Sequence, residues 1–337
     1  MRRILKQMPD TSERGFVIIA VLWILVALST LAMIFSVYLS NSARALGVAD
    51  TGIAKDALVS ASLELTAYQL LLTDEKSRPA QGSFRFRLDN ADVLVTFTSE
   101  AARVDLNAAP KQMLANLFEV LGAQQQAAAE VAERIVGWRT PPKNGAANDE
   151  EALYFASGLT YSPRQAPFAH VNELSLVLGG SPALVERALP YVTVFSRSAD
   201  VDVLIAAPEV IAALPGMTPE ALNDFLKQRS SLPRDKAAIA AALGPAAKAA
   251  GTLPQAKFFR VLTALRFDNG RRMSSEAVIA LSAEKGKEQD KNKDTGRSSN
   301  NSDKVNTKDK DKGPYTILSW QDDVETGTRS VRRAGGS

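Results

Sequence analysis

The stretch FVIIAVLWILVALSTLAMIFSVYL, at residues 16–39, decides the organisation of the chain. Roughly 24 residues without a charge, at about 1.5 Å of helical rise each, span about 36 Å, which exceeds the hydrocarbon core of a bilayer at about 30 Å. Backbone groups inside a membrane have no water to bond, so the run predicts a helix. Because no proline occurs between Phe16 and Arg78, we expect this helix to continue well past the membrane.

The polar leader before this run, residues 1–15, ends in Gly15 immediately ahead of Phe16. It carries more basic than acidic residues, which by the positive-inside tendency places it in the cytoplasm and everything after Leu39 outside. A cleaved secretory signal would have a shorter apolar run, often followed by a small-residue cleavage site, so an uncleaved signal anchor is the simplest interpretation. A glycine at the cytoplasmic edge of a membrane helix opens a second interpretation, in which the chain is cut after Gly15.

The composition argues against an enzyme. The chain has 337 residues, 45% of them hydrophobic, with no cysteine and a single histidine, His170. This content suffices for one or two domains outside the membrane. The formal charge of +3 resides mostly in the leader and in polar tails, so it says little about the folded part. Neither a Cys-His pair nor a histidine-ligated metal site can be built. His170 lies just ahead of an amphipathic helix, where we expect a capping or surface role.

The segment after the membrane, residues 40–104, has the pattern of a helix that packs on a sheet. One apolar stripe recurs at alternating spacings of four and three residues and should end near Thr73; it comprises Ala54, Leu58, Ala61, Leu65, Tyr68 and Leu72. Residues 83–88 and 93–98 then alternate with a period of two, and residues 89–92 between them supply turn formers. A long helix followed by a β-hairpin is typical of type IV pilins.

Residues 105–257 have a helical composition and interrupt the strands. The hexad Asp105-Leu106-Asn107-Ala108-Ala109-Pro110 leads into a predicted helix that ends at Gly122, and residues 124–138 form a second helix. Residues 203–208 and the turn at Gly216 repeat this pattern weakly, and both copies resemble helix-hairpin-helix units. Such units can bind DNA through backbone N–H groups, but Gly122 has no neighbouring Lys or Arg for a phosphate. Nucleic acid is therefore not the expected partner.

Strand character is found at residues 189–195 and again at 258–267. Asn269-Gly270 is a strong hairpin signal, and residues 277–281 supply the partner strand. Residues 258–284 and 314–321 are therefore assigned to the C-terminal strands of the sheet. Residues 285–313 are almost entirely polar or charged and cannot offset their ordering entropy by burial, so they are predicted to be disordered. The polar residues 322–337 are predicted to form a flexible tail.

Taken in order, these features resemble the minor pseudopilin K family of the type II secretion system. The resemblance is carried by the glycine-ended leader, by Ala20 where most pilin-like proteins have a glutamate, by the hexad at 105–110, and by residues 168–178, 189–194 and 315–320. It implies an α+β fold, with a type IV pilin-like long N-terminal helix on an antiparallel sheet and a large α-helical domain of helix-hairpin-helix-like units inserted. One departure is Leu204-Ile205, where Leu-Asn is common in the family.

The resemblance also implies how the protein is processed and where it is located. A prepilin peptidase would cut between Gly15 and Phe16 and methylate Phe16, leaving a single-pass inner-membrane protein with its C-terminal domain in the periplasm. Ala20 and the bulky insertion suit the tip of the pseudopilus, where partners would be other minor pseudopilins, the major pseudopilin and secreted proteins.

No cofactor is required by the resemblance, but Ca²⁺ occurs in the family. Asp149-Glu150-Glu151 offers the oxygen ligands that this ion prefers, although three adjacent acids also suit a solvated helix start. The alternative function is a minor pilin of a type IV fibre that contacts DNA or a surface.

Overall fold

The computed structural model describes residues 12–75, 77–142, 149–248, 256–282, 313–322 and 324, with side chains described from residue 17, except for 41–51. Most of the predicted leader, of the charged segment 285–313 and of the tail 322–337 lies outside the described residues. The chain forms two compact units, Met1–Leu58 and Val59–Ser337. Helix α1 (Ser12–Leu71) begins in the first unit and ends in the second.

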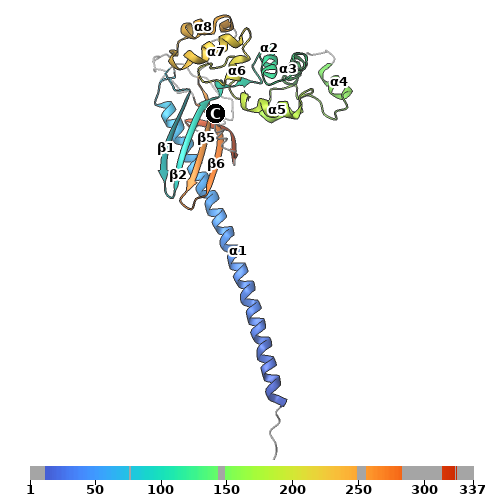
Figure 1. Cartoon of the computed structure of the whole chain (residues 1–337), viewed down its shortest axis with the longest axis vertical. Coiled ribbons are helices and arrows are strands. Elements are labelled where there is room, and N and C mark those ends of the chain that lie inside the picture. The colour runs from blue at the N-terminus through green and yellow to red at the C-terminus, as the bar shows by residue number, and fades with distance from the viewer. Residues whose placement is uncertain are drawn as a thin grey trace, which may run out of the picture. The chain divides into compact units, whose positions relative to one another are not determined.

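The first unit contains the part of α1 that covers the apolar run (Figure 1). Val17–Ser40 has a mean hydropathy of 2.8 and is the one stretch, among the residues described, that is long and apolar enough to cross a membrane. Its large apolar side chains are exposed, as with Trp23 at 71%. A helix that fails to bury such residues in protein is suited to a lipid environment. The predicted helix is therefore confirmed, and it ends at Leu71, close to Thr73.

The second unit contains a five-stranded antiparallel sheet in the order β1-β2-β5-β6-β7. Its strands are β1 (Gln81–Leu88), β2 (Ala91–Ser99), β5 (Phe258–Phe267), β6 (Arg272–Leu281) and β7 (Tyr315–Asp322). The turn between β1 and β2 was predicted over 89–92, but Leu88 pairs with Ala91 and leaves only Asp89 and Asn90. Asp89 has φ of +53°, the left-handed conformation that tight hairpin turns require. Strand β6 also begins earlier than predicted, at Arg272.

The sheet has one apolar and one polar face. Along β2, Val93, Val95 and Phe97 are buried, whereas Asp92 and Thr96 are exposed. In the second unit α1 contributes the buried side chains Val59, Leu63, Ala67 and Leu70. Figure 1 shows this part of α1 behind β1 and β2, and Tyr315 Oη on β7 donates to Glu64 Oε1 at 3.2 Å. The pilin-like layout of a helix on an antiparallel sheet is confirmed.

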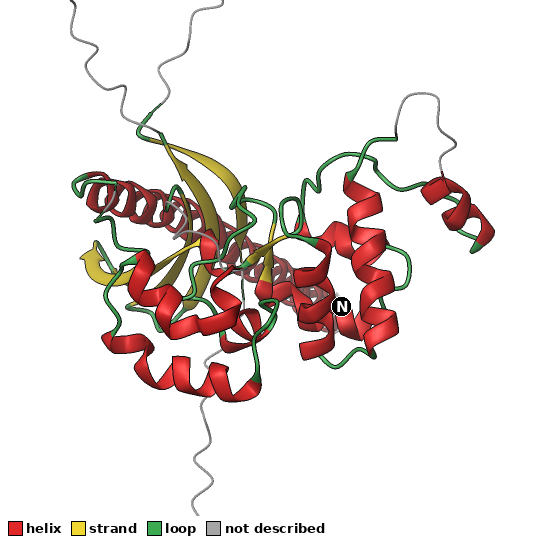
Figure 2. Ribbon diagram, turned by 90° about the horizontal axis from the view of Figure 1, so that it is seen from above, coloured by secondary structure: helices red, strands yellow, loops and turns green. Residues whose placement is uncertain are grey.

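Between β2 and β5 the chain forms a group of short helices, gathered beyond one end of the strands in Figures 1 and 2. They are α2 (Lys111–Val120), α3 (Gln125–Arg139), α4 (Asp149–Ala156), α5 (Pro182–Ala188), α6 (Pro208–Ala212), α7 (Pro219–Gln228) and α8 (Lys236–Leu243), with 3₁₀ turns η1 (Glu100–Ala102), η2 (Val171–Leu176), η3 (Leu189–Tyr191), η4 (Arg229–Ser231) and η5 (Gly244–Lys248). Large side chains such as Phe118, Tyr154 and Phe225 are fully buried in one core. The fold class is therefore α+β, with helical units inserted into the sheet.

A second, two-stranded sheet lies at the base of the insertion. β3 (Val104–Asp105) pairs in parallel with β4 (Val192–Thr193). The predicted strand over 189–195 was largely wrong, because Leu189–Tyr191 is a 3₁₀ turn around Pro190. Proline fixes φ near −65° and has no N–H for a ladder, which favours the turn. The pairing brings the start of the insertion against a segment nearly 90 residues later.

Candidate functional site

The insertion contains two structurally equivalent helical units, each opened by a buried aspartate. Asp105 Oδ1 accepts from Asn107 N at 2.7 Å, and its carbonyl accepts from Ala109 N at 2.8 Å. Asp202 Oδ1 accepts from Leu204 N at 3.2 Å, and its carbonyl accepts from Ala206 N at 2.9 Å. An aspartate that bonds the backbone two residues on is a standard turn former. The repeat seen in the sequence is thus real.

The register of the repeat differs by one residue from the sequence prediction. Aligning Pro110 with Pro208 pairs Asp105 with Val203, whereas the hydrogen bonds pair Asp105 with Asp202. The reason is that Pro110 is the N-cap of α2, but Pro208 is the first residue of α6. The position that matches Asn107 is therefore Leu204.

An arginine at the end of the second helix closes each helical unit, Arg139 as the last residue of α3 and Arg229 directly after α7. Arg139 Nη2 donates to Ala109 O at 2.8 Å, and Arg229 Nη1 donates to Ala206 O at 2.7 Å. These carbonyls lie in the turn before α2 and α6, so each arginine ties the end of a helical hairpin to its beginning. In the first helical unit the Asn107 side chain also forms hydrogen bonds with the backbone N–H and carbonyl of Phe168, which holds the segment around Phe168 against the start of the unit.

The glycine turns of the two units have the conformation that helix-hairpin-helix turns need. Gly122 has φ of +94° and Gly216 has φ of +85°. At the first turn, Gly122 N donates to Glu119 O and Ala123 N donates to Phe118 O, both at 2.9 Å. These two N–H groups are used within the protein. A phosphate would need them free, so the geometry gives no support to DNA binding at this turn.

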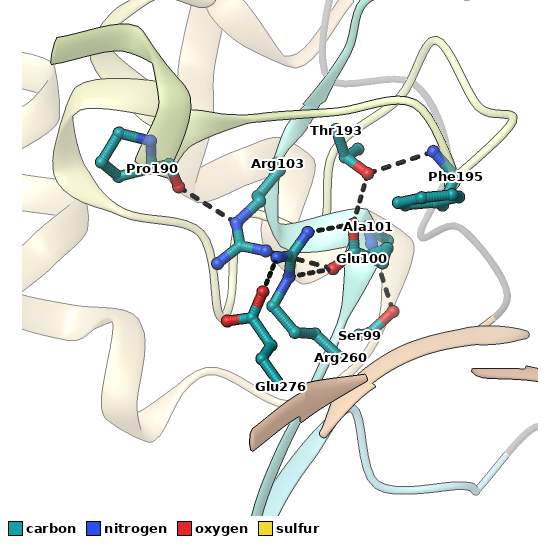
Figure 3. Close-up of polar contacts among 9 residues, drawn as sticks. All are labelled: Ser99, Glu100, Ala101, Arg103, Pro190, Thr193, Phe195, Arg260 and Glu276. Atoms are coloured by element: carbon teal, nitrogen blue, oxygen red, sulfur yellow. Dashed lines mark hydrogen bonds and ion pairs between the residues drawn. The ribbon is translucent and has the colours of Figure 1, made fainter. Parts of the chain in front are cut away.

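The junction between the insertion and the sheet is an ionic network around Glu100 (Figure 3). The Glu100 side chain is fully buried, and Oε1 lies 2.7 Å from Arg260 Nε and 3.1 Å from Arg103 Nη1. Thr193 Oγ1 on β4 donates to the other carboxylate oxygen, and Arg260 also pairs with Glu276 on β6. Arg103 Nε donates to Pro190 O at 3.0 Å. Residues of the sheet, of η1 and of the insertion therefore meet at one carboxylate.

The network keeps Glu100 ionised in spite of its burial. Burial by itself raises the pKa of a carboxylate, but the charge and hydrogen bonds of Arg260, together with Arg103 and Thr193, hold the pKa of Glu100 below its ordinary value. Two carboxylates and two guanidinium groups balance one another, and every oxygen of Glu100 has a partner. Such a group holds the fold together and is not available as a base or metal ligand.

The junction was not predicted from the sequence. Glu100 follows a strand directly, where an acidic residue indicates the start of a turn. Its main partner, Arg260, lies 160 residues away in the sequence. One local signal was available, because Ser99 caps η1 by accepting from Ala101 N. That signal predicts a helical turn but gives no information about distant partners.

The residues predicted from the resemblance lie in α1 and stay predictions. Gly15 and Phe16 fall in its first turn, in the helical backbone that starts at Ser12. Ala20 is half-buried one turn further on. Cleavage, methylation and position in a fibre require partners outside the chain.

The acidic trio forms the first turn of α4, which agrees with the helix-start interpretation. Glu150 Oε2 pairs with Arg134 Nη1 at 2.9 Å, and its Oε1 is buried with no hydrogen-bond partner among the described residues. Burial raises the pKa of Glu150. No group of three metal-binding side chains occurs within the described residues, and residues 143–148 beside the trio lie outside them. Ca²⁺ binding by this region therefore stays a prediction.

His170 is the N-cap of η2. Its Nδ1 accepts from Asn172 N at 3.1 Å, and the side chain is exposed. The predicted capping role is confirmed.

The comparison with known proteins agrees with this geometry. The family model for the type II secretion system (T2SS) protein K matches residues 86–197, which run from β1 through β3, the first helical unit and β4. This segment resembles protein K, and we call it the protein K domain after the model that it matches. The chain is 29% identical over 162 residues to the type II secretion system protein K of Klebsiella pneumoniae, and the alignment covers 43% of this chain. The chain spans about half (49%) of the length of that curated relative.

The fold of the protein K domain and its surroundings also has a solved counterpart. A chain in the crystal structure of the GspK-GspI-GspJ complex of enterotoxigenic Escherichia coli superimposes with a TM-score of 0.57 at 16% identity, covering 81% of this chain and 98% of that chain. At this identity the likeness establishes the fold. Together the comparisons show that residues 86–197 resemble protein K and that the chain shares the fold of the chain in that complex.

Proposed function

We propose that the chain is a minor pseudopilin of the type II secretion system and occupies the tip of the periplasmic pseudopilus, where it supports export of folded proteins across the outer membrane. The observation that carries the proposal is the protein K domain, which is part of a pilin-like fold and follows a helix of membrane length in the sequence. The match favours a secretion fibre over a type IV fibre. The one helix of membrane length among the described residues suits a single-pass inner-membrane anchor with the second unit in the periplasm.

Processing is proposed to occur between Gly15 and Phe16. A peptidase that binds the residue before the cut in a tight site needs the missing side chain of glycine there, and the new N-terminus at Phe16 would be methylated. Amino-terminal sequencing of the membrane form tests this. We expect Gly15→Val to block cleavage, whereas Gly52→Ala, in the same helix with nothing within 4 Å of the added methyl group, should be cut normally. An intact Met1 terminus in a host with active peptidase would contradict the proposal.

The tip position rests on Ala20. A carboxylate in a bilayer costs about 2.5–3.5 kcal/mol at a helix centre on insertion scales, so the glutamate common at this position is retained where it neutralises the terminal amine of a preceding subunit. Alanine cannot do this, so the chain suits the place that has no predecessor. The inserted helices also favour the tip, because an insertion the size of a domain would clash with neighbouring subunits in a tightly wound shaft.

Copy counting in sheared fibres, with site-specific cross-linking from the second unit, tests the tip position. We expect about one copy per fibre, cross-linked only to other minor pseudopilins. Many copies along the shaft would rule out the tip. We expect no cofactor to be required; Ca²⁺ binding stays a prediction from the family resemblance, and calorimetric titration of the EDTA-treated protein with CaCl₂ tests it.

A further inference from the structure

The polar face of the five-stranded sheet carries four arginines near the two hairpin turns. In the strand register Arg87, Asp92, Arg266 and Arg272 form one row across β1, β2, β5 and β6. Arg85, Leu94, Ala264 and Ser274 form the next row. Side chains two residues apart on a strand share a face, so both rows face the same side. We call these eight residues the arginine face.

The arginine face is hollowed into a groove of about 930 Å³, lined by all eight of its residues. Leu94 and Ala264 lie in the middle strands and are half-buried, while the four arginines are exposed. Val324 closes the groove on the side of β6, where its carbonyl accepts from Ser274 Oγ. The groove therefore has a small apolar floor and a rim of guanidinium groups.

Three of the four arginines have no partner within the described residues. Arg87 already holds carboxylates, with Nη1 at 3.1 Å from Asp92 Oδ1 and Nη2 at 2.7 Å from Asp268 Oδ2. No ion pair or side-chain hydrogen bond of Arg85, Arg266 or Arg272 occurs in the part of the chain that the structure describes. Asp92 and Asp268 are both held by Arg87, so the other three arginines leave the face with a net positive charge.

We propose that the arginine face docks an extended acidic segment of a partner protein. Guanidinium groups form strong charge-assisted hydrogen bonds with carboxylates, and Arg87 Nη2 here donates to both carboxylate oxygens of Asp268. The other three arginines lie on β1, β5 and β6 and so span the width of the groove, where an extended segment that crosses the strands meets them in turn. Residues 325–337 carry one acidic side chain, Glu325, against Arg329, Arg332 and Arg333, so the chain's own residues after Val324 offer no run of alternate carboxylates. The proposal does not depend on the fibre assignment.

The test is binding of a fluorescein-labelled peptide of four Asp-Thr repeats to the full-length protein in dodecyl maltoside micelles, followed by anisotropy at low ionic strength. The groove variant combines Arg85→Gln, Arg266→Gln and Arg272→Gln. A control variant removes the same charge from exposed helix residues, with Arg187→Gln, Lys227→Gln and Lys236→Gln. We expect the groove variant to bind roughly tenfold more weakly and the control to stay within about twofold of wild type.

Further measurements distinguish an acidic protein segment from other ligands of the groove. A peptide of Asn-Thr repeats should bind at least about tenfold more weakly than the acidic one, since only carboxylates take ionic bonds from arginine. Circular dichroism should show the groove variant folded, and Arg266→Gln alone should still weaken binding by about threefold. Equal binding of the two peptides, or equal losses in the groove and control variants, would overturn the proposal. Tighter, groove-dependent binding of a thymidine oligonucleotide of the same charge would overturn the assignment to a protein partner.

Discussion

Replacing Glu100 by glutamine should destabilise the second unit more than any other neutralisation of a single acid. The carboxylate is fully buried between Arg260 and Arg103 and accepts from Thr193. Removing one partner of a buried ion pair costs about 3–5 kcal/mol, because the other charge stays buried without compensation. Arg260 keeps Glu276 and Arg103 keeps the Pro190 carbonyl, so we expect the lower end, about 3 kcal/mol.

Urea unfolding of the full-length protein in nonionic micelles, followed by near-ultraviolet circular dichroism, measures this loss. Glu133→Gln is the matched control, because Glu133 is 55% exposed and its pair with Lys111 should contribute no more than about 0.5 kcal/mol. A double variant, Glu100→Gln with Arg260→Gln, should lose less than the sum of the two single losses, since it no longer leaves the Arg260 charge unpaired. A loss for Glu100→Gln as small as that for Glu133→Gln would refute the reasoning.

Three other outcomes are expected. Gly122→Ala should cost about 1–2 kcal/mol, because alanine is strained at φ of +94° and its methyl group would lie 3.1 Å from Arg187 Nη1; Gly52→Ala, in an open helical position, should be neutral or stabilising. Asp202→Asn should cost about 1–3 kcal/mol in urea unfolding, because it weakens the 2.6 Å ion pair with Arg234 at a buried oxygen, and an unchanged midpoint would contradict this. The stabilisation by Glu100 should be complete above its unfolded pKa of about 4.3 and vanish as the pH falls through its lower folded pKa, so wild type and Glu100→Gln should converge in stability only below about pH 4.

The sequence predicted those elements whose signal is local. The apolar run at 16–39, the alternation in β1, β2 and β5, and the glycine turn after α2 each follow from neighbouring residues, and the structure confirms the elements. The hairpin signal at Asn269-Gly270 was also correct, with Gly270 at φ of +82°.

What the sequence could not predict depends on distant pairs. β3 and β4 have two residues each, too few for any periodicity, and they exist because Val104 meets Val192. Glu100 is indistinguishable in the sequence from an exposed acid until Arg260 is placed beside it. The predicted register of the helical repeat was wrong by one residue because it aligned Pro110 with Pro208. The equivalent hydrogen bonds are those of Asp105 and Asp202.

The pairing of β2 with β5 also bears on the order in which the protein folds. Ser99 pairs with Phe259, so the two central strands can meet only after a loop of about 160 residues has closed. For a flexible chain of that length the entropy of closure grows to roughly 4.5 kcal/mol above a constant, and contacts so distant in sequence form slowly. If the helices and the short β3–β4 bridge form first, they shorten this loop, because the bridge brings Val104 against Val192. The insertion would then act as an internal folding template, and a circular permutant opened within it should form its central strand pair more slowly than the native chain.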